Sequence, residues 1–389
     1  MNFDKMTKLV TYLDHHASAP LLPAARDAMI DMLEIVGNPS SVHANGRKLR
    51  AAIETARDKL ALAAGTIRSR VVFTGSATEA LTQAIVGGAQ SGNVARIVYG
   101  AGEHMAVVRA VEATGKAAKT IPMLANGLYD LEELAADISA ANDADERLMI
   151  VVQQVNNETA VVQPIADIEH LLAETGHLLI LDAAQGFGKT QFFFDPSRVD
   201  AMAISGHKIG GPVGVGALVV KPAMDNAKLI PGGGQEQGRR GGTESAALIA
   251  GFGVAAEDAK TRFDAVRAAK LIELAQEGLL KIAPNATIFG IDVERTGTAM
   301  CFAVPGLKNN ISLINYDLEN VALSAGSACS SGKVSRSHVL SAMGVDDALA
   351  DCALRLSVGW NSTGDDIERF LTVTKKIVAR HQSTRGAAA

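Results

Sequence analysis

Four residues near the middle of the chain, Ser205-Gly206-His207-Lys208, have the types and order that covalent chemistry needs. They follow the apolar run 201–204 and precede a glycine-rich run at 210–216. A lysine at the end of a buried strand loses the water that keeps its amine protonated, so the amine becomes a nucleophile. The stretch therefore predicts a Schiff-base lysine, although most lysines at strand ends are simply solvated.

Other polar side chains also follow apolar runs, at 71–73, 96–99, 148–155 and 178–181. In an open α/β sheet the carboxyl ends of the strands line the ligand crevice, so we expect these side chains to meet there. As a set they suit a flat, phosphorylated ring that contains nitrogen. Asp182 can pair with a ring nitrogen, and His104 can stack on the ring and move a proton.

The remaining members of the set supply hydrogen bonds. Ala77 and Thr78 lie at a strand-to-helix turn, where backbone N–H groups and the helix dipole attract an anion. Ser205 and His207 add side-chain donors, and Asn157 and Gln185 can bond a ring hydroxyl. Each residue alone also has a structural interpretation, such as a helix cap for Thr78 or a turn for Asp182.

The elements that must position these residues alternate in type along the chain. Helical patterns at 23–37 and 46–65 precede five strands that alternate with helices, and a long helical stretch at 245–283 follows, broken by Gly251 and Gly253. Strands near 299–302, 321–324 and 354–358 come last. We predict an α/β fold, in which residues 21–260 form a large domain with a mostly parallel sheet. Residues 261–389 form a smaller α+β domain, against which residues 1–20 pack.

Composition limits the class of protein. The chain has 389 residues, of which 48% are hydrophobic and 20% charged, and a net charge of −5. This is typical of a globular protein with a sizeable core, and it gives no basic surface for nucleic acid or an anionic membrane. The N-terminus lacks the apolar core of a signal peptide, and no run of eighteen apolar residues occurs. We therefore expect a cytoplasmic protein whose partners are small molecules and other proteins.

The three cysteines form neither a paired framework nor a metal-binding spacing. Cys329 lies among small residues at 324–333, which predicts a mobile segment and a thiol that reacts once a nearby charge lowers its pKa. A chance loop cysteine is the alternative. Cys301 and Cys352 are predicted to be packed core thiols. Arg355, in an apolar strand, requires a carboxylate partner, either a substrate or an internal salt bridge.

Taken in order, these motifs resemble the pyridoxal-phosphate (PLP) enzymes called cysteine desulfurases, which are class V aminotransferases of fold type I. The resemblance runs from Tyr12 to about Ile367, and the run around Cys329 resembles the long catalytic loop, at about 324–338, of the group I (NifS/IscS) type. The motifs that carry it are Ala77-Thr78-Glu79, Glu103-His104, Val155-Asn156-Asn157-Glu158, Asp182-Ala183-Ala184-Gln185, Ser205-Gly206-His207-Lys208, Gly232-Gly233-Gly234-Gln235-Glu236 and Gly242-Thr243.

The resemblance implies roles for these residues. Lys208 holds PLP covalently and acts on the substrate's α-proton, Asp182 holds the ring nitrogen, and His104 stacks on the ring. Ala77, Thr78, Ser205 and His207 bind the phosphate. Gln185 and Asn157 contact the phenolic side, and Asn157 and Arg355 bind the substrate. Thr243 reaches the cofactor of a partner subunit, which implies a homodimer.

The resemblance also implies a reaction. Cys329 takes sulfur from L-cysteine as a persulfide and passes it to acceptor or scaffold proteins of iron–sulfur cluster assembly, or to tRNA thiolation. No metal site is implied beyond a transient contact of Cys329 with an iron–sulfur cluster.

Three points leave other interpretations open. His15 and His16 stand where the family more often has small or amide residues. A near match to a phosphate-binding P-loop occurs at Gly186-Phe187-Gly188-Lys189-Thr190. It lacks the first glycine of that motif, because Ala183 stands at this position. The same fold could also serve an ordinary class V aminotransferase, a selenocysteine lyase or a scaffold without activity.

Overall fold

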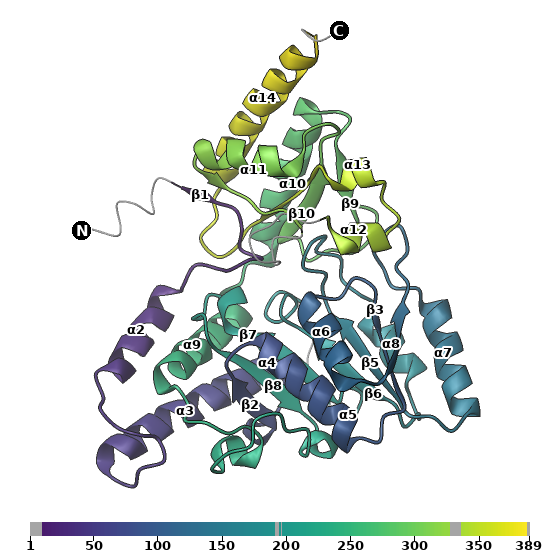
Figure 1. The fold of residues 1–389 in the computed structure, drawn as a ribbon. Coiled ribbons are helices and arrows are strands. Elements are labelled where there is room, and N and C mark those ends of the chain that lie inside the picture. Colours follow the sequence, from purple (N-terminus) through teal and green to yellow (C-terminus); the bar gives the residue numbers. More distant parts are fainter. Residues whose placement is uncertain (1–9, 191–193, 196, 327–335, 387–389) are drawn as a thin grey trace.

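A seven-stranded sheet forms the larger part of the protein in the computed structural model, and a smaller three-stranded sheet lies above it (Figure 1). The structure describes residues 10–190, 194–195, 197–326 and 336–386. Cys329 and most of the predicted catalytic loop therefore lie outside the described residues.

The large sheet has the strand order β2-β8-β7-β6-β5-β3-β4. Strands β3 to β7 are mutually parallel, while β8 is antiparallel to both of its neighbours, so the predicted mostly parallel sheet is confirmed. The five predicted strands are present, and β4 and β8 are additional. The bounds are β2 Val71–Thr74, β3 Arg96–Gly100, β4 Ala117–Ile121, β5 Leu148–Gln153, β6 Leu178–Asp182, β7 Ala201–Ser205 and β8 Gly216–Val220.

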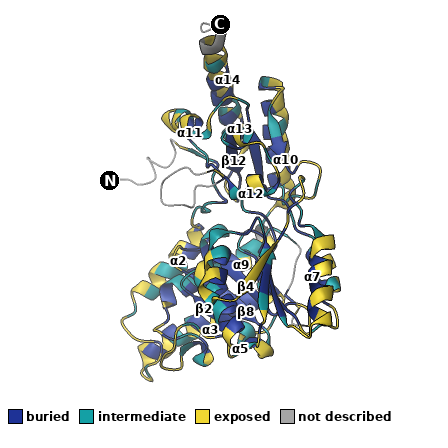
Figure 2. Cartoon of the chain, turned by 45° about the vertical axis from the view of Figure 1, so that its right-hand side comes forward, coloured by how far each residue is buried: buried dark blue, intermediate teal, exposed yellow. Residues whose placement is uncertain are grey.

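Helices cover both faces of this sheet, which is why its central strands are continuous apolar runs. One face packs against α3, α7, α8 and α9, and the other against α4, α5 and α6. Figure 2 shows the buried strands within the layers and the exposed outer side of α7. The bounds are α2 Pro23–Leu33, α3 Ala44–Ala64, α4 Ala77–Thr82, α5 Gly88–Ser91, α6 Met105–Thr114, α7 Leu131–Asp143, α8 Ile165–Leu171 and α9 Ala246–Arg262.

The predicted break of the helical stretch 245–283 at its two glycines is wrong. The break falls between α9 and α10 (Ala265–Ile282), where Asp264 caps α10 by accepting a hydrogen bond from the Arg267 N–H at 2.9 Å. Gly253 lies inside α9, where a Cβ would stand 2.6 Å from the Cα of Ala56 in α3. The glycine therefore permits close helix packing and does not end the helix.

The smaller part contains the antiparallel sheet β12-β10-β9 and is covered mainly by α10, α11 and α14. Cys301 on β10 and Cys352 just before β12 are buried, as predicted, and burial raises the pKa of the Cys301 thiol. The bounds are β9 Thr287–Phe289, β10 Ala299–Ala303, α11 Asn309–Leu318, α12 His338–Ala342, α13 Asp347–Ala350, β12 Ala353–Ser357 and α14 Gly364–Gly386.

The N-terminal segment is held by the smaller part. Strand β1 (Thr11–Tyr12) pairs in parallel with β11 (Val321–Ala322). The His16 N–H donates to the hydroxyl of Ser357, at the end of β12, at 2.9 Å. The segment then runs on to the carboxyl end of β7 in the large sheet, where the Ala19 N–H donates to the carbonyl of His207 at 2.8 Å.

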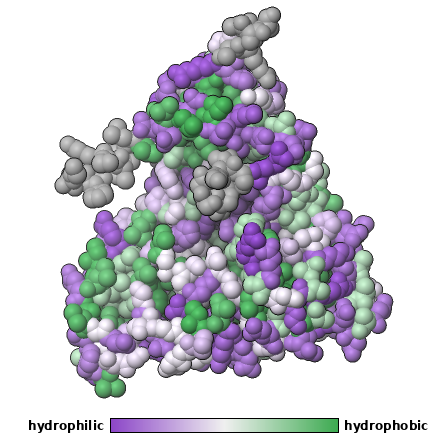
Figure 3. Space-filling model, in the orientation of Figure 1, coloured by the Kyte–Doolittle hydropathy of each residue, from purple (hydrophilic) through white to green (hydrophobic). Residues whose placement is uncertain are grey.

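The surface carries a group of exposed apolar side chains on and after α2. They include Ile30, Leu33 and Val36, and Figure 3 shows an apolar patch over α2 at the lower left. Within the residues that the structure covers, no helix is both long and apolar enough to span a bilayer.

Candidate active site

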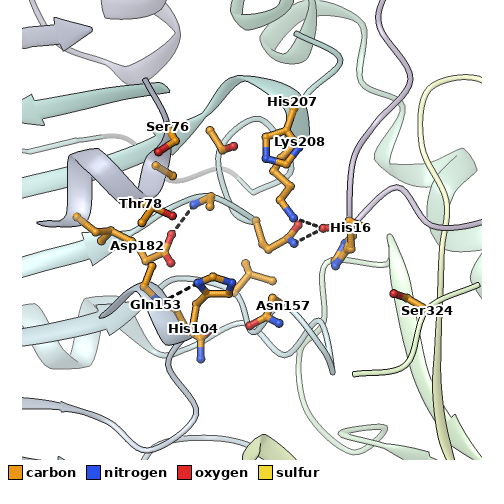
Figure 4. Close-up of a pocket in the computed structure, with 18 of the residues that line it drawn as sticks. His16, Ser76, Thr78, His104, Gln153, Asn157, Asp182, His207, Lys208 and Ser324 are labelled. Carbon is orange, nitrogen blue, oxygen red and sulfur yellow. Dashed lines mark hydrogen bonds between the residues drawn. The ribbon is translucent and has the colours of Figure 1, made fainter. Parts of the chain in front are cut away.

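A cavity of about 270 Å³ lies at the carboxyl ends of the large sheet's strands (Figure 4). Its walls come from the strand ends and the helix starts after them, the N-terminal segment around His16, the segment at Ser324 and Gly326, and β12 of the smaller sheet. The structure brings ten predicted site residues together around it. These are Ala77, Thr78, His104, Asn157, Asp182, Gln185, Ser205, His207, Lys208 and Arg355.

Lys208 lies in the short turn that follows β7. Its ammonium donates a hydrogen bond to the backbone carbonyl of His16, and the Gln185 amide donates to the same carbonyl at 2.8 Å (Figure 4). One backbone oxygen of the N-terminal segment thus holds two of the predicted cofactor residues at the cavity wall.

Asp182 is the last residue of β6, in which all five residues are buried. One carboxylate oxygen accepts a hydrogen bond from the Ala184 N–H at 2.9 Å. Burial raises the pKa of this carboxyl, while the Ala184 N–H and the nearby His104 and Lys208 act in the opposite direction. A buried carboxylate in this position favours a cationic partner in the cavity.

His104 caps helix α6, and its Nδ1 accepts a hydrogen bond from the Ala106 N–H at 3.1 Å. Because Nδ1 accepts, the exchangeable ring proton belongs on Nε2. The imidazole lies along the cavity wall, between Asp182 and Asn157 (Figure 4). It can therefore offer both a flat face and a titratable nitrogen to a ligand.

The opposite end of the cavity is formed by the start of α4. Ser76 caps the helix by accepting a hydrogen bond from the Glu79 N–H at 3.1 Å. The first N–H groups of a helix lack partners within the helix and favour an anion. Gly216 lets β8 approach closely, because a Cβ there would stand 2.7 Å from the Ala77 nitrogen.

His207 lies beside this anion-binding end, and its Nδ1 is 3.3 Å from the Ser18 hydroxyl. Burial, together with Lys208 and Lys189, lowers the pKa of His207 to about 4. The imidazole is therefore neutral near pH 7 and acts as a dipolar hydrogen-bonding group.

Arg355 carries the internal salt bridge that the sequence left as an alternative. Its guanidinium donates to a carboxylate oxygen of Asp14 and to the backbone carbonyl of Asn157, both at 2.8 Å. Arg355 is nevertheless part of the cavity wall. Its Nε and the Asn157 Oδ1 are buried and have no hydrogen-bond partner among the described residues, so each can serve a ligand.

This donor set fits PLP. A lysine amine, a buried carboxylate, an imidazole face and a helix start surround one cavity, and the amide oxygen of Asn157 is buried without a partner in the described part of the chain. A group with an aldehyde, a basic ring nitrogen and a phosphate would use each of these features.

Two predicted residues are not part of this wall. Thr243 is exposed and lies away from the cavity, and Cys329 is outside the described residues. The sequence reading also missed Ser76, Gln153 and Ser324, which line the cavity. Ser76 could have been found, because a serine followed by a glutamate three residues later is a helix-start signal.

The comparisons with known proteins cover almost the whole chain. The aminotransferase class-V family matches residues 11–370. An IscS-like cysteine desulfurase from Mycobacterium tuberculosis is 35% identical over 98% of this chain and 99% of its own length. A human cysteine desulfurase is 34% identical over 92% of this chain and 79% of its own length.

Solved structures agree with this result. A NifS-like protein from Rickettsia africae superposes with a TM-score of 0.85 at 31% identity and covers 95% of this chain and 99% of its own. A structure described as SspA in complex with cysteine gives a TM-score of 0.77 at 31% identity, over 89% of this chain and 98% of its own. The chain therefore belongs to the class-V aminotransferase family and, within it, to the IscS- and NifS-like cysteine desulfurases.

Proposed function

We propose that this chain is a PLP-dependent cysteine desulfurase that converts L-cysteine to L-alanine and holds the sulfur as a persulfide on Cys329. The main support from the structure is the set of side chains that line the cavity. Lys208, Asp182 and His104 come from three different strand ends and line a single cavity together with Arg355.

The cofactor would be held by residues at both ends of the cavity. Lys208 would bind its aldehyde carbon, Asp182 would keep its ring nitrogen protonated, and the start of α4 with Ser205 and His207 would bind its phosphate. When bound, PLP supplies an electron sink for charge that develops at the substrate's α-carbon.

The substrate would be oriented by Arg355 and Asn157. Arg355 would bind the α-carboxylate, with Asn157 beside it. The Lys208 amine would remove and return protons, with His104 as a second proton carrier. L-cysteine and the Cys329 thiol together give L-alanine and a Cys329 persulfide. This exchange breaks one C–S bond, forms one S–S bond and needs no outside oxidant.

The test is the product analysis. The purified chain, supplied with PLP, L-cysteine and a thiol reductant, is expected to release alanine and sulfide in equal amounts, measured by chromatography and a sulfide-specific dye. Formation of a keto acid with transfer of the amino group, and no sulfide, would instead identify an ordinary aminotransferase.

The further destination of the sulfur is part of the proposal. We propose that scaffold or acceptor proteins of iron–sulfur assembly receive it, with tRNA thiolation as a second route. A cytoplasmic location and the domain limits 1–20, 21–260 and 261–389 stay predictions. Among the relatives, one from Drosophila melanogaster is named mitochondrial and one from Trachipleistophora hominis mitosomal.

A homodimer is the proposed assembly, and two observations support it. The apolar side chains on and after α2 are exposed in the single chain, and Figure 3 shows an apolar patch over this helix. Contiguous apolar surface of this kind is typical of protein interfaces. Thr243 is exposed and away from its own chain's cavity, which suits a role at the cofactor of a partner subunit.

Charges placed in this patch are expected to separate the subunits. The double variant Leu33→Glu, Val36→Glu buries two carboxylates in the proposed interface, so the molar mass measured by light scattering should fall from that of a dimer to that of a monomer. Leu318→Glu on α11 is the matched control, because Leu318 is 76% exposed, as Leu33 is at 71%, but lies on the smaller part. An unchanged dimer in the double variant would place the interface elsewhere.

A further inference from the structure

The stretch 186–190, which resembles a P-loop in sequence, is not a phosphate loop in the structure. After β6 the chain makes successive turns, in which the Phe187 N–H donates to the Ala183 carbonyl at 2.9 Å and the Thr190 N–H donates to the Gly186 carbonyl at 3.0 Å. No helix starts between Gln185 and Thr190, so the stretch lacks the helix start that a P-loop requires. Lys189, the lysine of this stretch, instead forms a hydrogen bond within the protein.

Lys189 is half-buried and donates a hydrogen bond from Nζ to the Oε1 of Gln185 at 3.0 Å. The amide nitrogen of Gln185 donates to the His16 carbonyl at 2.8 Å, which also accepts from Lys208. Two lysines are thus connected through one amide and one backbone oxygen. Lys189 contacts Gln185 and does not line the cavity itself.

These contacts fix which end of the Gln185 amide faces each neighbour. Lys189 donates to the Gln185 Oε1 in either charge state, so the amide oxygen faces Lys189. A backbone carbonyl only accepts, so Gln185 must present its nitrogen to His16. The amide nitrogen carries a second N–H, and Gln185 lines the cavity. That N–H is therefore available as a donor to a ligand oxygen.

We propose that Lys189 is a positioning residue that holds the Gln185 amide as a donor toward the phenolic oxygen of PLP. The proposal rests on the function proposed above, because it assigns a residue behind the cofactor site. Lys189 acts through Gln185 and touches neither substrate nor cofactor.

The positive charges around the cavity favour a ligand oxygen that carries negative charge beside Gln185. Burial, together with the positive charges of Lys208 and Arg355, lowers the pKa of Lys189 to about 7. Three basic side chains that converge on one region repel one another. An electron-rich oxygen that accepts from Gln185 reduces this repulsion.

The first experiment replaces Lys189 by methionine, which keeps most of the volume but removes the donor and the charge. PLP is removed from the full chain and titrated back while the visible absorption of the bound cofactor is recorded. We expect about 10-fold weaker binding, because a buried amide oxygen loses a charged donor. We also expect the visible band to titrate at a higher pH, since a positive charge behind the phenolic oxygen is gone. The other titratable groups that face the cavity are unchanged: His16, His104, Asp182, His207, Lys208 and Arg355.

Lys59→Met is the matched control. Lys59 on α3 is also half-buried but pairs with Glu257 of α9 and does not line the cavity, so its loss should leave both readouts unchanged. Wild-type binding and a wild-type band in Lys189→Met would overturn the proposal. A wild-type chain that binds no PLP would refute the proposed function itself, which is a distinguishable result.

A second comparison shows whether Lys189 acts through Gln185, even if Lys189→Met is less stable. Both lysine forms are prepared in a Gln185→Leu background, where the amide is absent. If Lys189 works by orienting the amide, the 10-fold effect of Lys189→Met on PLP binding should vanish in this background. Additive effects of the two substitutions would assign Lys189 a separate, merely structural role.

Discussion

Cys329→Ala is expected to release no sulfide from L-cysteine while it still binds PLP and still changes the visible spectrum when L-cysteine is added. The cavity residues that would hold cofactor and substrate are untouched by this substitution, so binding should persist. The sulfur, however, loses its acceptor, and turnover should fall by at least about 1,000-fold, the usual range for loss of a nucleophile. Sulfide and alanine assays measure the loss, and absorbance measures the retained binding.

The two other cysteines provide the control for this experiment. Cys352→Ala removes a buried thiol whose Sγ donates to the Ala348 carbonyl at 3.3 Å, outside the cavity. It should keep its activity and lose about 1 kcal/mol of unfolding free energy, the typical cost of a small core truncation. If Cys329→Ala kept full sulfide release, the sulfur-transfer step assigned to this thiol would be wrong.

Lys208→Ala should be equally severe but fail at an earlier point. Without the amine, the chain cannot hold PLP covalently, and the proton transfers at the substrate's α-carbon lose their base, so alanine formation should drop by about 1,000-fold or more. Borohydride reduction followed by peptide mapping should label position 208 in the wild type and leave the variant unlabelled. A label at another lysine would relocate the site.

The two variants together separate binding from transfer. Lys208→Ala is expected to lose the cofactor's covalent attachment, whereas Cys329→Ala is expected to keep it. Lys59→Ala serves as the lysine control, since Lys59 lies on α3, pairs with Glu257 and is not part of the cavity wall. Its cofactor content and turnover should match those of the wild type.

The sequence allowed the strand ends of the large sheet to be predicted because the side chains that do chemistry there follow long apolar runs. Asp182 and Lys208 are clear examples, since Asp182 ends β6, Lys208 lies in the turn directly after β7, and both strands are buried throughout. Strand β4 was missed because four of its five residues are exposed at the sheet edge, so it lacks an apolar pattern. Gly251 and Gly253 misled the helix prediction, because a glycine that ends a helix and one that permits close packing look the same in sequence.

Contacts between distant segments could not be predicted from the sequence. The salt bridge between Arg355 and Asp14 joins two ends of the chain, and only the fold places them side by side. The anchor for Lys208 and Gln185 is a backbone carbonyl, which every residue type possesses, so the identity of His16 gives no signal for it. Lys189 matched a motif with another meaning, and its role becomes visible only in its contact with Gln185.

The anchoring of the N-terminal segment also determines the order in which parts of the protein can fold during synthesis. The His16 amide is held by Ser357, 341 positions later, so His16 leaves the ribosome long before this partner does. The elements of the large sheet and its layers, up to α9, precede β12 in the sequence and can pack while translation continues. Arg355 on β12 is part of the cavity wall, so the nascent chain cannot complete the cavity around Lys208 before β12 has emerged.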